Sequence, residues 1–488
     1  MPDGQSFGAL TMRPGKLIAV HLNYESRIAQ RGRRPEHPSY FLKPASSVSA
    51  SGDTIERPAG TELLGFEGEI ALIIGAPVRR VAPEQAWSHV SGVTAANDFG
   101  VYDLRWADRG SNLRAKGGDG FTPLGPGVLD AAGLDPAGLR VRTWVNGKLA
   151  QQGTSAELAF PFARLIADLS QLMTLEPGDV ILTGTPAGAS VVVPGDIIEV
   201  EVDAPEAPQA PSTGRLVTRV TDGSAPLAGY GALPKIDDLQ REEAWGSRAA
   251  AGLPAAFELT PRLRDKLASV STATLSAQLR KRGFDEMSID GLRSTRPGTK
   301  VVGLARTLRF IAFRDDLFAA RGGGYNAQKR AFDSLRPGDV LVIEARGERG
   351  TGTVGDILAL RAQTLGAVAI VTDGGVRDYA TVADLGIPTY SQGPHPAVLG
   401  RRHVPWDVDV TISCGGAAVQ PGDVIVGDAD GLVVIPPVLA AELADAAAEQ
   451  EREEAFIAEQ VAAGQPVDGL YPLNATWREK YEQWPPGT

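Results

Sequence analysis

The hydrophobic pattern of this chain changes once along its length, and that change constrains the fold more than any other feature. Before about Gly229, short runs rich in β-branched residues, such as GEIALIIG and DIIEVEV, lie between Gly, Pro and Asp residues, which is typical of strands. After about Pro254, runs such as DVLVIEARG and AVAIVTDGG alternate with helical patterns, which is typical of an α/β layer. A chain of 488 residues also exceeds one ordinary core. The sequence therefore predicts domains of two different architectures.

The stretch between the two patterns, YGALPKIDDLQREEAWGSRAAAGLP, mixes Pro, Gly and charged residues and has no strand pattern. We therefore predict an N-terminal mixed-β domain over 1–235, a linker over 236–256 and a C-terminal α/β domain over 257–488. A long Ala/Glu-rich helix is predicted over 437–464, with its charged face in solvent. The aromatic residues that follow would be costly to expose, so we expect them to dock on a neighbouring domain or subunit.

Charge and cysteine content argue against several classes of protein. The formal net charge of −11 argues against nucleic acid or an anionic membrane as the main partner. No apolar run approaches the ~20 residues needed to span a membrane, and the N-terminus lacks a basic segment followed by an apolar core. The single cysteine, Cys414, cannot form an internal disulfide or a thiolate metal site. We expect a cytoplasmic protein with neither nucleic-acid nor membrane partners.

Three carboxylates in the N-terminal half form the first candidate site. Glu67 and Glu69 are two residues apart on a predicted strand, so their side chains point to the same face. Such neighbours repel one another unless protons or a cation neutralise them. Asp98 closes the strand-like segment SGVTAAND, and three carboxylates with open positions suit Mg²⁺ or Mn²⁺. The alternative is a strand with one solvated face, followed by a turn aspartate.

A second group of polar residues lies in the C-terminal half. Asp356 opens a helical pattern, and twenty residues further on Arg377-Asp378 follows a buried strand and a glycine turn. Asp356 suits a helix N-cap, and an Arg beside an Asp is commonly a surface ion pair. At the end of a strand, after glycines that let a ligand approach the backbone, the same residues suit a binding site. The residues alone leave both interpretations open.

Several motifs of the N-terminal half occur together and in order. They include FEGEIALIIG, SGVTAAND, LRAKGGDGFTPLGP and SQLMTLEPGDVILTGTPAG. With them, the chain from about 16 to 222 resembles the fumarylacetoacetate hydrolase superfamily, and within it the decarboxylase/isomerases of homoprotocatechuate degradation. The resemblance implies a mixed-β fold of that type. It also implies that Glu67, Glu69 and Asp98 bind a divalent metal.

The same resemblance assigns three further residues. Lys116 would be the site lysine, with Asp119 near it, and Thr185 of the TGTP loop would offer backbone contacts to a substrate carboxylate. A 2-oxo acid would chelate the metal, which stabilises the enolate formed when CO₂ leaves or a proton moves. Lys116 could pair with that developing charge or relay a proton.

The chain departs from the family pattern just after the Asn-Tyr motif at 23–24. Family members that hydrolyse or decarboxylate often carry a His and a Glu three residues apart, where this chain has Arg27 and Gln30. Gln30 cannot act as a general base, and Arg27 stays protonated. His21, Glu25 or the Glu36-His37 pair could substitute, or these residues could be structural or exposed. The departure favours metal-assisted isomerisation or decarboxylation over hydrolysis by an activated water.

The C-terminal half, from about 270 to 484, resembles another family. Motifs such as RPGDVLVIEARG and SCGGAAVQPGDVIVGDADGLVVIP are similar to those of the family that unites 4-hydroxy-4-methyl-2-oxoglutarate aldolases with RraA-like ribonuclease regulators. The resemblance implies an α/β fold of the class II pyruvate aldolase type. Regulator members lack the first Asp of the spaced motif, so the presence of Asp356 favours catalysis over ribonuclease binding.

By this second resemblance, Asp378 would bind a divalent metal and Arg377 would hold the keto oxygen or the enolate. Asp356 would orient metal-bound water. The backbone amides of Ile357 and Leu358, at a helix start, would suit a substrate carboxylate.

Together these features predict a bifunctional enzyme of aromatic catabolism with one Mg²⁺ or Mn²⁺ in each domain. The first half would decarboxylate or isomerise an unsaturated 2-oxo diacid, and the second would cleave a 4-hydroxy-2-oxo acid to pyruvate. The alternatives are a single catalytic half with a regulatory or oligomerisation module, two oxaloacetate-type decarboxylases, or a fumarylacetoacetate-type C–C hydrolase. The partners would be small 2-oxo acids and further copies of the chain, with a hexamer expected because the two families differ in symmetry.

Overall fold

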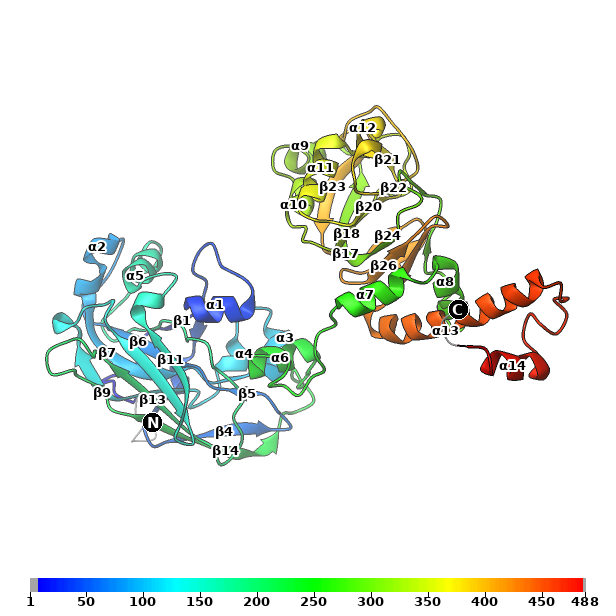
Figure 1. Ribbon diagram of the computed structural model, residues 1–488. Helices are drawn as coiled ribbons and strands as arrows, with labels where there is room; N and C mark the ends of the chain where they lie inside the picture. The colour runs from blue at the N-terminus through cyan, green and yellow to red at the C-terminus, as the bar shows by residue number, and fades with distance from the viewer. Residues whose placement is uncertain (1–7, 486–488) are drawn as a thin grey trace. The chain divides into compact units, whose positions relative to one another are not determined.

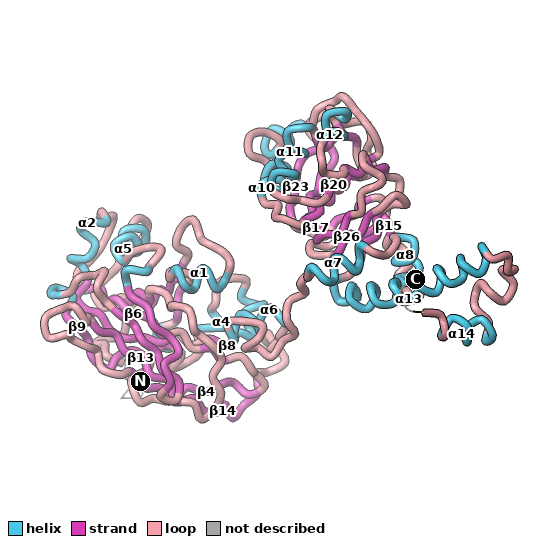
Figure 2. The backbone as a smooth tube through the Cα atoms, in the orientation of Figure 1, coloured by secondary structure: helices cyan, strands magenta, loops and turns pink. Residues whose placement is uncertain are grey.

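The computed structural model describes residues 8–485, and the chain divides into two compact units over 1–256 and 257–488. The N-terminal unit is built from β-sheets with short helices at their edges, and the C-terminal unit combines one large sheet with helices (Figures 1 and 2). Among the described residues, no helix is both long and apolar enough to cross a membrane.

Two large sheets and one two-stranded sheet form the described part of the N-terminal unit. A seven-stranded sheet has the order β2-β1-β12-β6-β7-β9-β3, and a five-stranded sheet has the order β11-β10-β13-β14-β4. The strands are β1 (Leu17–Val20), β2 (Tyr40–Lys43), β3 (Val48–Ala50), β4 (Thr54–Ala59), β5 (Leu64–Gly65), β6 (Gly68–Ile74), β7 (Val90–Asn97), β8 (Gly100–Val101), β9 (Thr122–Asp130), β10 (Arg140–Val145), β11 (Lys148–Thr154), β12 (Val180–Leu182), β13 (Ile197–Asp203) and β14 (Leu216–Pro226). The helices are α1 (Glu25–Arg31), α2 (Pro83–Ala86), α3 (Arg105–Asp108), α4 (Leu113–Lys116), α5 (Phe162–Ser170) and α6 (Asp238–Trp245).

One apolar core joins the two sheets. Ile70 and Leu72 of β6 pack in the same buried cluster as Val141 of β10 and Val200 of β13. The alternating pattern predicted from the sequence produces this arrangement, because every second side chain of a strand faces the opposite sheet. Helix α5, with its buried residue Ile166, closes one end of the cluster.

The pairing of β6 with β7 positions the ends of these two strands. The strands are antiparallel, and Gly68 at the start of β6 lies opposite Asn97 at the end of β7. The Asp98 amide donates to the Glu67 carbonyl over 2.8 Å, which extends the ladder by one step. Residues far apart in sequence therefore meet at the same end of this strand pair.

The C-terminal unit is an α/β structure, as the alternating pattern predicts. Its sheet has the order β15-β27-β26-β17-β18-β20-β22-β16, with β23 also paired to β17, and the neighbours β17, β18, β20 and β22 are parallel. The strands are β15 (Ser288–Ile289), β16 (Arg293–Ser294), β17 (Val301–Ala312), β18 (Asp339–Glu344), β19 (Gly352–Val354), β20 (Ala369–Thr372), β21 (Gly375–Val376), β22 (Thr389–Ser391), β23 (His403–Val408), β24 (Ile412–Cys414), β25 (Ala417–Val419), β26 (Val424–Gly427) and β27 (Leu432–Ile435). The helices are α7 (Pro261–Ala268), α8 (Thr272–Arg280), α9 (Asp315–Arg321), α10 (Ala327–Asp333), α11 (Asp356–Thr364), α12 (Tyr379–Asp384), α13 (Ala440–Ala462) and α14 (Ala475–Glu482).

Two segments differ from the sequence-based expectation. Part of the stretch predicted as linker folds as helix α6, with Asp237 as its N-cap and Ala244 buried against the N-terminal unit. The C-terminal aromatic residues do not extend toward another domain or subunit. They pack on the end of their own long helix, where Phe456 contacts the rings of Trp477 and Trp484. The turn between α13 and α14 folds the chain back, so the apolar surface is covered within the same segment.

Candidate active site

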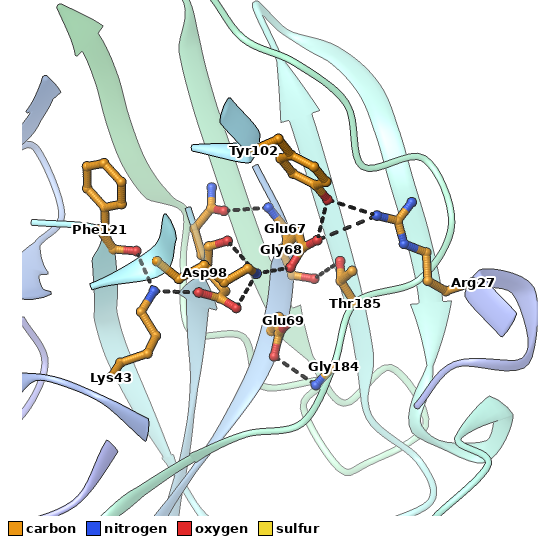
Figure 3. A network of polar contacts seen from close by, with 12 residues as sticks. Arg27, Lys43, Glu67, Gly68, Glu69, Asp98, Tyr102, Phe121, Gly184 and Thr185 are labelled. Atoms are coloured by element: carbon orange, nitrogen blue, oxygen red, sulfur yellow. Dashed lines mark hydrogen bonds and ion pairs between the residues drawn. The ribbon is translucent and has the colours of Figure 1, made fainter. Parts of the chain in front are cut away.

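Glu67, Glu69 and Asp98 converge at the shared edge of β6 and β7. A carboxylate oxygen from each lies within 4.8 Å of the others, and this is the one group of three potential metal ligands found among residues 8–485. Glu69 and Asp98 are almost fully buried, each with 1% of its surface exposed. In Figure 3 the three side chains lie next to one another, and the Glu69 carboxylate is turned toward the Gly184 amide. The structure therefore brings together the three residues that the sequence singled out.

Two lysines approach this carboxylate cluster, which we define as Glu67, Glu69 and Asp98. The Lys116 ammonium at the end of α4 donates to Glu67 and Asp98. The Lys43 ammonium at the end of β2 donates to Asp98 and, over 3.0 Å, to the carbonyl of Phe121 (Figure 3). Both lysines are buried, so their charges act on the carboxylates with little screening by water.

Glu69 has a different set of contacts from the other two carboxylates. It accepts a hydrogen bond from the Gly184 amide over 2.7 Å, and no described lysine or arginine donates to it. The φ of Gly184 is +96°, a conformation that glycine adopts without strain and that directs its amide at the carboxylate. One member of the cluster is thus held only by a neutral donor.

These contacts shift the pKa values in opposite directions. Burial raises the pKa of Glu69 well above its usual range, and the neighbouring Asp98 and Glu67 carboxylates add to the shift. Burial also acts to raise the pKa of Glu67, but Lys116 and Arg27 outweigh it and lower the pKa. Burial acts to lower the pKa of Lys116, but the Asp98 and Glu67 carboxylates outweigh burial. The pKa of Lys116 is therefore raised, and its ammonium form is favoured.

The residues fit a divalent cation. Three carboxylate oxygens from separate chain positions converge, and among the described residues Glu69 accepts only from the neutral Gly184 amide, so it has no charged donor of its own. Hard cations such as Mg²⁺ and Mn²⁺ take oxygen ligands of this kind. A cation at the cluster would be held by Glu67, Glu69 and Asp98.

Arg27 and Gln30 on helix α1 lie where an acid–base pair was expected. The Arg27 guanidinium donates to Gln30 Oε1 over 2.6 Å and lies 3.5 Å from Glu67 Oε1. The Tyr102 hydroxyl donates to the same Glu67 oxygen over 3.1 Å. Arg27 is buried, so this position holds a fixed positive charge beside the cluster instead of a base.

The other candidates for that missing pair are differently placed. His21 lines the same cavity as Glu67 and Lys116, and its ring contacts the Ser39 carbonyl. Glu25 instead pairs with Arg34 at the surface, and the Glu36-His37 pair is exposed. Of these residues, only His21 lies close to the carboxylate cluster.

Thr185 and Asp119 were predicted to lie near the substrate. The Thr185 hydroxyl donates to the Gly68 carbonyl over 2.8 Å, which places this residue beside the cluster. Asp119 does not join it: the glycine turn after α4 carries Asp119 to the wall of another cavity, which it shares with Asp53 and Arg114. The resemblance to the family implied that Asp119 lies near Lys116 at the site, whereas the structure lines a different cavity with it.

Sequence reasoning missed Lys43, Tyr102 and Arg105 as site residues. Of these three, only Lys43 could have been found from the local sequence. It ends an apolar strand, and a lysine is rarely buried unless its charge is paired. Tyr102 and Arg105 follow Asp98 by a few residues and reach the cavity through the turn and helix α3. Their contacts depend on tertiary structure.

The second group lies where β19 pairs with β21. This parallel pairing sets Gly352 beside Gly375 and brings the start of α11 next to the Arg377-Asp378 turn. A Cβ atom at Gly352 would lie 2.4 Å from the Arg377 side chain, so glycine is needed there. The Arg377 guanidinium lies 3.3 Å from Asp378 Oδ2, and both side chains are partly exposed.

Asp356 is not the N-cap that the sequence suggested. Helix α11 begins at Asp356 itself with Gly355 as the cap, and the Asp356 carboxylate accepts from the Ile357 amide over 2.9 Å. A Cβ at Gly355 would lie 3.4 Å from Asp378 Oδ2, an ordinary van der Waals distance, so the helix cap lies next to that carboxylate. The turn thus leaves room for the Asp378 carboxylate close to the helix start, where the Ile357 and Leu358 amides lie.

Two protein families match this chain. The fumarylacetoacetate (FAA) hydrolase C-terminal family matches residues 16–221, and the aldolase/RraA family matches residues 269–434. An uncharacterised protein of Archaeoglobus fulgidus is 39% identical over 191 residues, which cover 39% of this chain and 75% of that protein. The chain therefore belongs to the fumarylacetoacetate hydrolase family through its N-terminal half and carries an RraA-like C-terminal half.

The relatives with a described activity resemble the N-terminal half. The 4-hydroxyphenylacetate degradation bifunctional isomerase/decarboxylase of Escherichia coli is 40% identical over 218 residues, which cover 44% of this chain and 49% of that protein. The homoprotocatechuate catabolism bifunctional isomerase/decarboxylase, also of Escherichia coli, is 39% identical over the same length. The chain spans about half the length of these relatives.

Solved structures resemble each half separately. A 5-carboxymethyl-2-hydroxymuconate delta-isomerase from Mycobacterium smegmatis is 35% identical, with a TM-score of 0.39, and the match covers 44% of this chain and 81% of that one. RraAS2 of Streptomyces coelicolor, described as an unusual member of the RNase ES inhibitor RraA family, is 35% identical, with a TM-score of 0.38, and the match covers 42% and 98%.

Proposed function

We propose that the N-terminal half is a divalent-metal-dependent decarboxylase or isomerase of an unsaturated 2-oxo diacid. The observation that carries the proposal is the buried carboxylate cluster with Lys116 and Lys43 beside it and a fixed arginine where a base would stand. The isomerase/decarboxylase relatives support the same class of reaction.

Decarboxylation leaves an electron pair on the substrate that must be delocalised and stabilised. When the bond to the leaving carboxylate breaks, the pair delocalises through the unsaturated chain toward the 2-oxo oxygen, and CO₂ departs. A bound divalent cation supplies a Lewis acid that stabilises the resulting negative charge. Isomerisation needs the same stabilisation and an acceptor for the proton that is lost in place of CO₂, a role that a neutral His21 in the same cavity could fill.

The chain's own residues would complete the reaction. Lys116 is buried and its pKa is raised, chiefly by Asp98 and Glu67 against the opposing effect of burial, so it stays protonated and can deliver a proton to the delocalised anion. The Arg27 guanidinium adds a second fixed positive charge. Neither residue can remove a proton from water, so hydrolysis of a C–C bond is disfavoured.

An assay of product type tests this proposal. With 5-carboxymethyl-2-oxo-hex-3-ene-1,7-dioate we expect CO₂ release that EDTA abolishes and Mg²⁺ or Mn²⁺ restores, and with acylpyruvates we expect no C–C hydrolysis. Acylpyruvate hydrolysis as the faster reaction would contradict the proposal.

We further propose that the C-terminal half is an aldolase that cleaves a 4-hydroxy-2-oxo acid to pyruvate. The proposal is supported by the proximity of Asp356, Arg377 and Asp378 at the start of helix α11. Asp378 would hold a second divalent ion, Asp356 would orient a water molecule, and Arg377 would pair with the keto oxygen. A ribonuclease-regulator role is the competing function for RraA-like domains.

Pyruvate release separates these two functions of the C-terminal half. We expect 4-hydroxy-4-methyl-2-oxoglutarate to yield pyruvate with the intact chain, and Asp378→Ala to lower the rate at least a hundredfold. Asp384→Ala, a substitution of an exposed carboxylate at the end of α12, is the matched control. Absence of pyruvate with the intact chain would favour a regulatory module.

A further inference from the structure

The segment between the two family matches contributes to the N-terminal cavity. Residues 222–268 lie outside both matches, yet helix α6 within this segment packs on the N-terminal unit. Its Ala244 is buried with Leu63, Tyr102 and Val191. The segment is therefore part of the folded unit and not a loose spacer.

Polar contacts tie α6 to the helix that carries Arg27. The Gln30 side chain of α1 donates to the Gly246 carbonyl at the end of α6 over 3.0 Å. Glu243 of α6 lies 3.5 Å from Arg31 of α1 and accepts from Arg105 Nη1 over 2.8 Å. One carboxylate of α6 thus bridges two arginines that belong to different helices.

Arg105 lies where two cavities meet, and Arg31 lines the inner one. The inner cavity is lined by Glu67, Lys116 and Arg27, and the outer cavity, with a volume of about 570 Å³, is lined by Glu243 and Gln240 of α6. The two share the lining residues His21, Leu22, Arg33, Arg105 and Asn112. A molecule with its reacting end at the carboxylate cluster would therefore extend past Arg105 toward α6.

Arg105 has hydrogen-bonding capacity to spare. Its Nη1 donates to Glu243, and no acceptor within residues 8–485 takes its Nε or Nη2. Arg33 at the same junction forms no ion pair or hydrogen bond to a described residue. A guanidinium with one edge fixed by a carboxylate and another edge free can bind a second carboxylate without first ordering its own side chain.

We propose that α6 forms a wall of the substrate cavity and that Arg105, held by Glu243, binds the distal carboxylate of the substrate. The inference rests on the proposed function for the reacting end, and it assigns the selection of diacids over monoacids to Arg105 together with α6, a helix that neither family match includes.

Calorimetric binding of two unreactive probes tests the proposal without turnover. 2-Oxoadipate and 2-oxohexanoate share the 2-oxo acid end, and only the former has a distal carboxylate. With Mg²⁺ present, we expect the whole chain to bind 2-oxoadipate roughly tenfold or more tightly, because a charge-assisted hydrogen bond is among the stronger polar contacts.

Substitutions at three positions locate the source of that preference. Arg105→Met should abolish the preference and leave 2-oxohexanoate binding within twofold of the starting value. Glu243→Gln should reduce the preference at least threefold, whereas Glu242→Gln, which removes a neighbouring carboxylate paired with Arg248, should leave it unchanged. If Arg105→Met loses both probes, the preference is measured on Arg105→Lys instead. We expect it to be reduced, because one ammonium cannot bind Glu243 and the ligand carboxylate in the way the guanidinium fork does.

Several results would overturn the inference. An unchanged preference in Arg105→Met, or in Arg105→Lys where Met is uninformative, would remove the assigned role of Arg105. Tighter 2-oxoadipate binding by Glu243→Gln would show that Glu243 competes with the ligand. Equal affinity of the intact chain for both probes would defeat the distal contact alone, whereas failure to bind either probe would also defeat the proposed function.

Discussion

At the level of single residues, the N-terminal site is a balance between crowded carboxylates and the cations around them. Glu67 and Asp98 each contact a lysine, while Glu69 has only an amide donor. The sequence predicted the three carboxylates, because their spacing and motif are local. It could not predict Lys43 and Tyr102 as partners, because their contacts depend on strands and turns that meet only in the folded chain.

Lys116 provides the first residue-level prediction. We expect Lys116→Met to lower kcat at least a hundredfold, which is the usual scale of a lost proton donor, with a smaller change in KM. Metal affinity should not fall, because the substitution removes a cation that competes for Glu67 and Asp98. Lys148→Met, at an exposed lysine of the same unit, is the control, and equal effects of both substitutions would argue against the role of Lys116.

Proton release on metal binding provides a second prediction. Because the pKa of Glu69 is raised by burial and by its neighbouring carboxylates, a proton competes with the cation, and metal affinity should fall as the pH is lowered. Titration calorimetry in two buffers of different ionisation enthalpy should therefore give different heats of Mg²⁺ binding in weakly acidic solution. Identical heats would mean that no proton leaves the cluster.

At the level of elements, predictions succeeded where the hydrophobic period was strong. The strands of GEIALIIG and DIIEVEV and the long C-terminal helix form as the sequence indicates. Helix α6 was missed because its eight residues carry only a weak apolar pattern, and its packing comes from a few long-range contacts such as Glu243 with Arg105. Short helices stabilised by tertiary contacts give little local signal.

The aromatic tail supports an element-level prediction. Phe456 is buried among Trp477, Tyr481 and Trp484, so Phe456→Ala should destabilise the docking of α14 by about 3–5 kcal/mol. Hydrogen exchange should show loss of protection in α14 and unchanged protection in β17, with Val461→Ala as a partly exposed control. Retained protection of α14 would mean that the tail is held elsewhere.

At the level of the whole molecule, each unit contains its own sheet, core and candidate site. The carboxylate cluster draws all its ligands from the N-terminal unit, and Asp356, Arg377 and Asp378 all come from the C-terminal unit. The change of sequence pattern predicted this division in outline. Helix α6 in the intervening segment was not predicted from the sequence and is seen only in the structure.

Because the two candidate sites share no residue, their activities should be separable. Asp378→Ala should leave the N-terminal turnover within twofold of the unchanged chain, and Glu67→Ala should leave pyruvate release unchanged. Both rates can be followed on one preparation with two substrates. Parallel loss of both activities in either variant would contradict independent sites.

Glu69→Ala tests whether the buried carboxylate cluster binds the catalytic metal of the N-terminal half. Mg²⁺ binding at the N-terminal half and CO₂ release from the diacid should be measured on the same variant, with exposed Glu84→Ala as the control. We expect Glu69→Ala to lose both by at least a hundredfold while the control keeps both. Full turnover by Glu69→Ala would contradict that assignment.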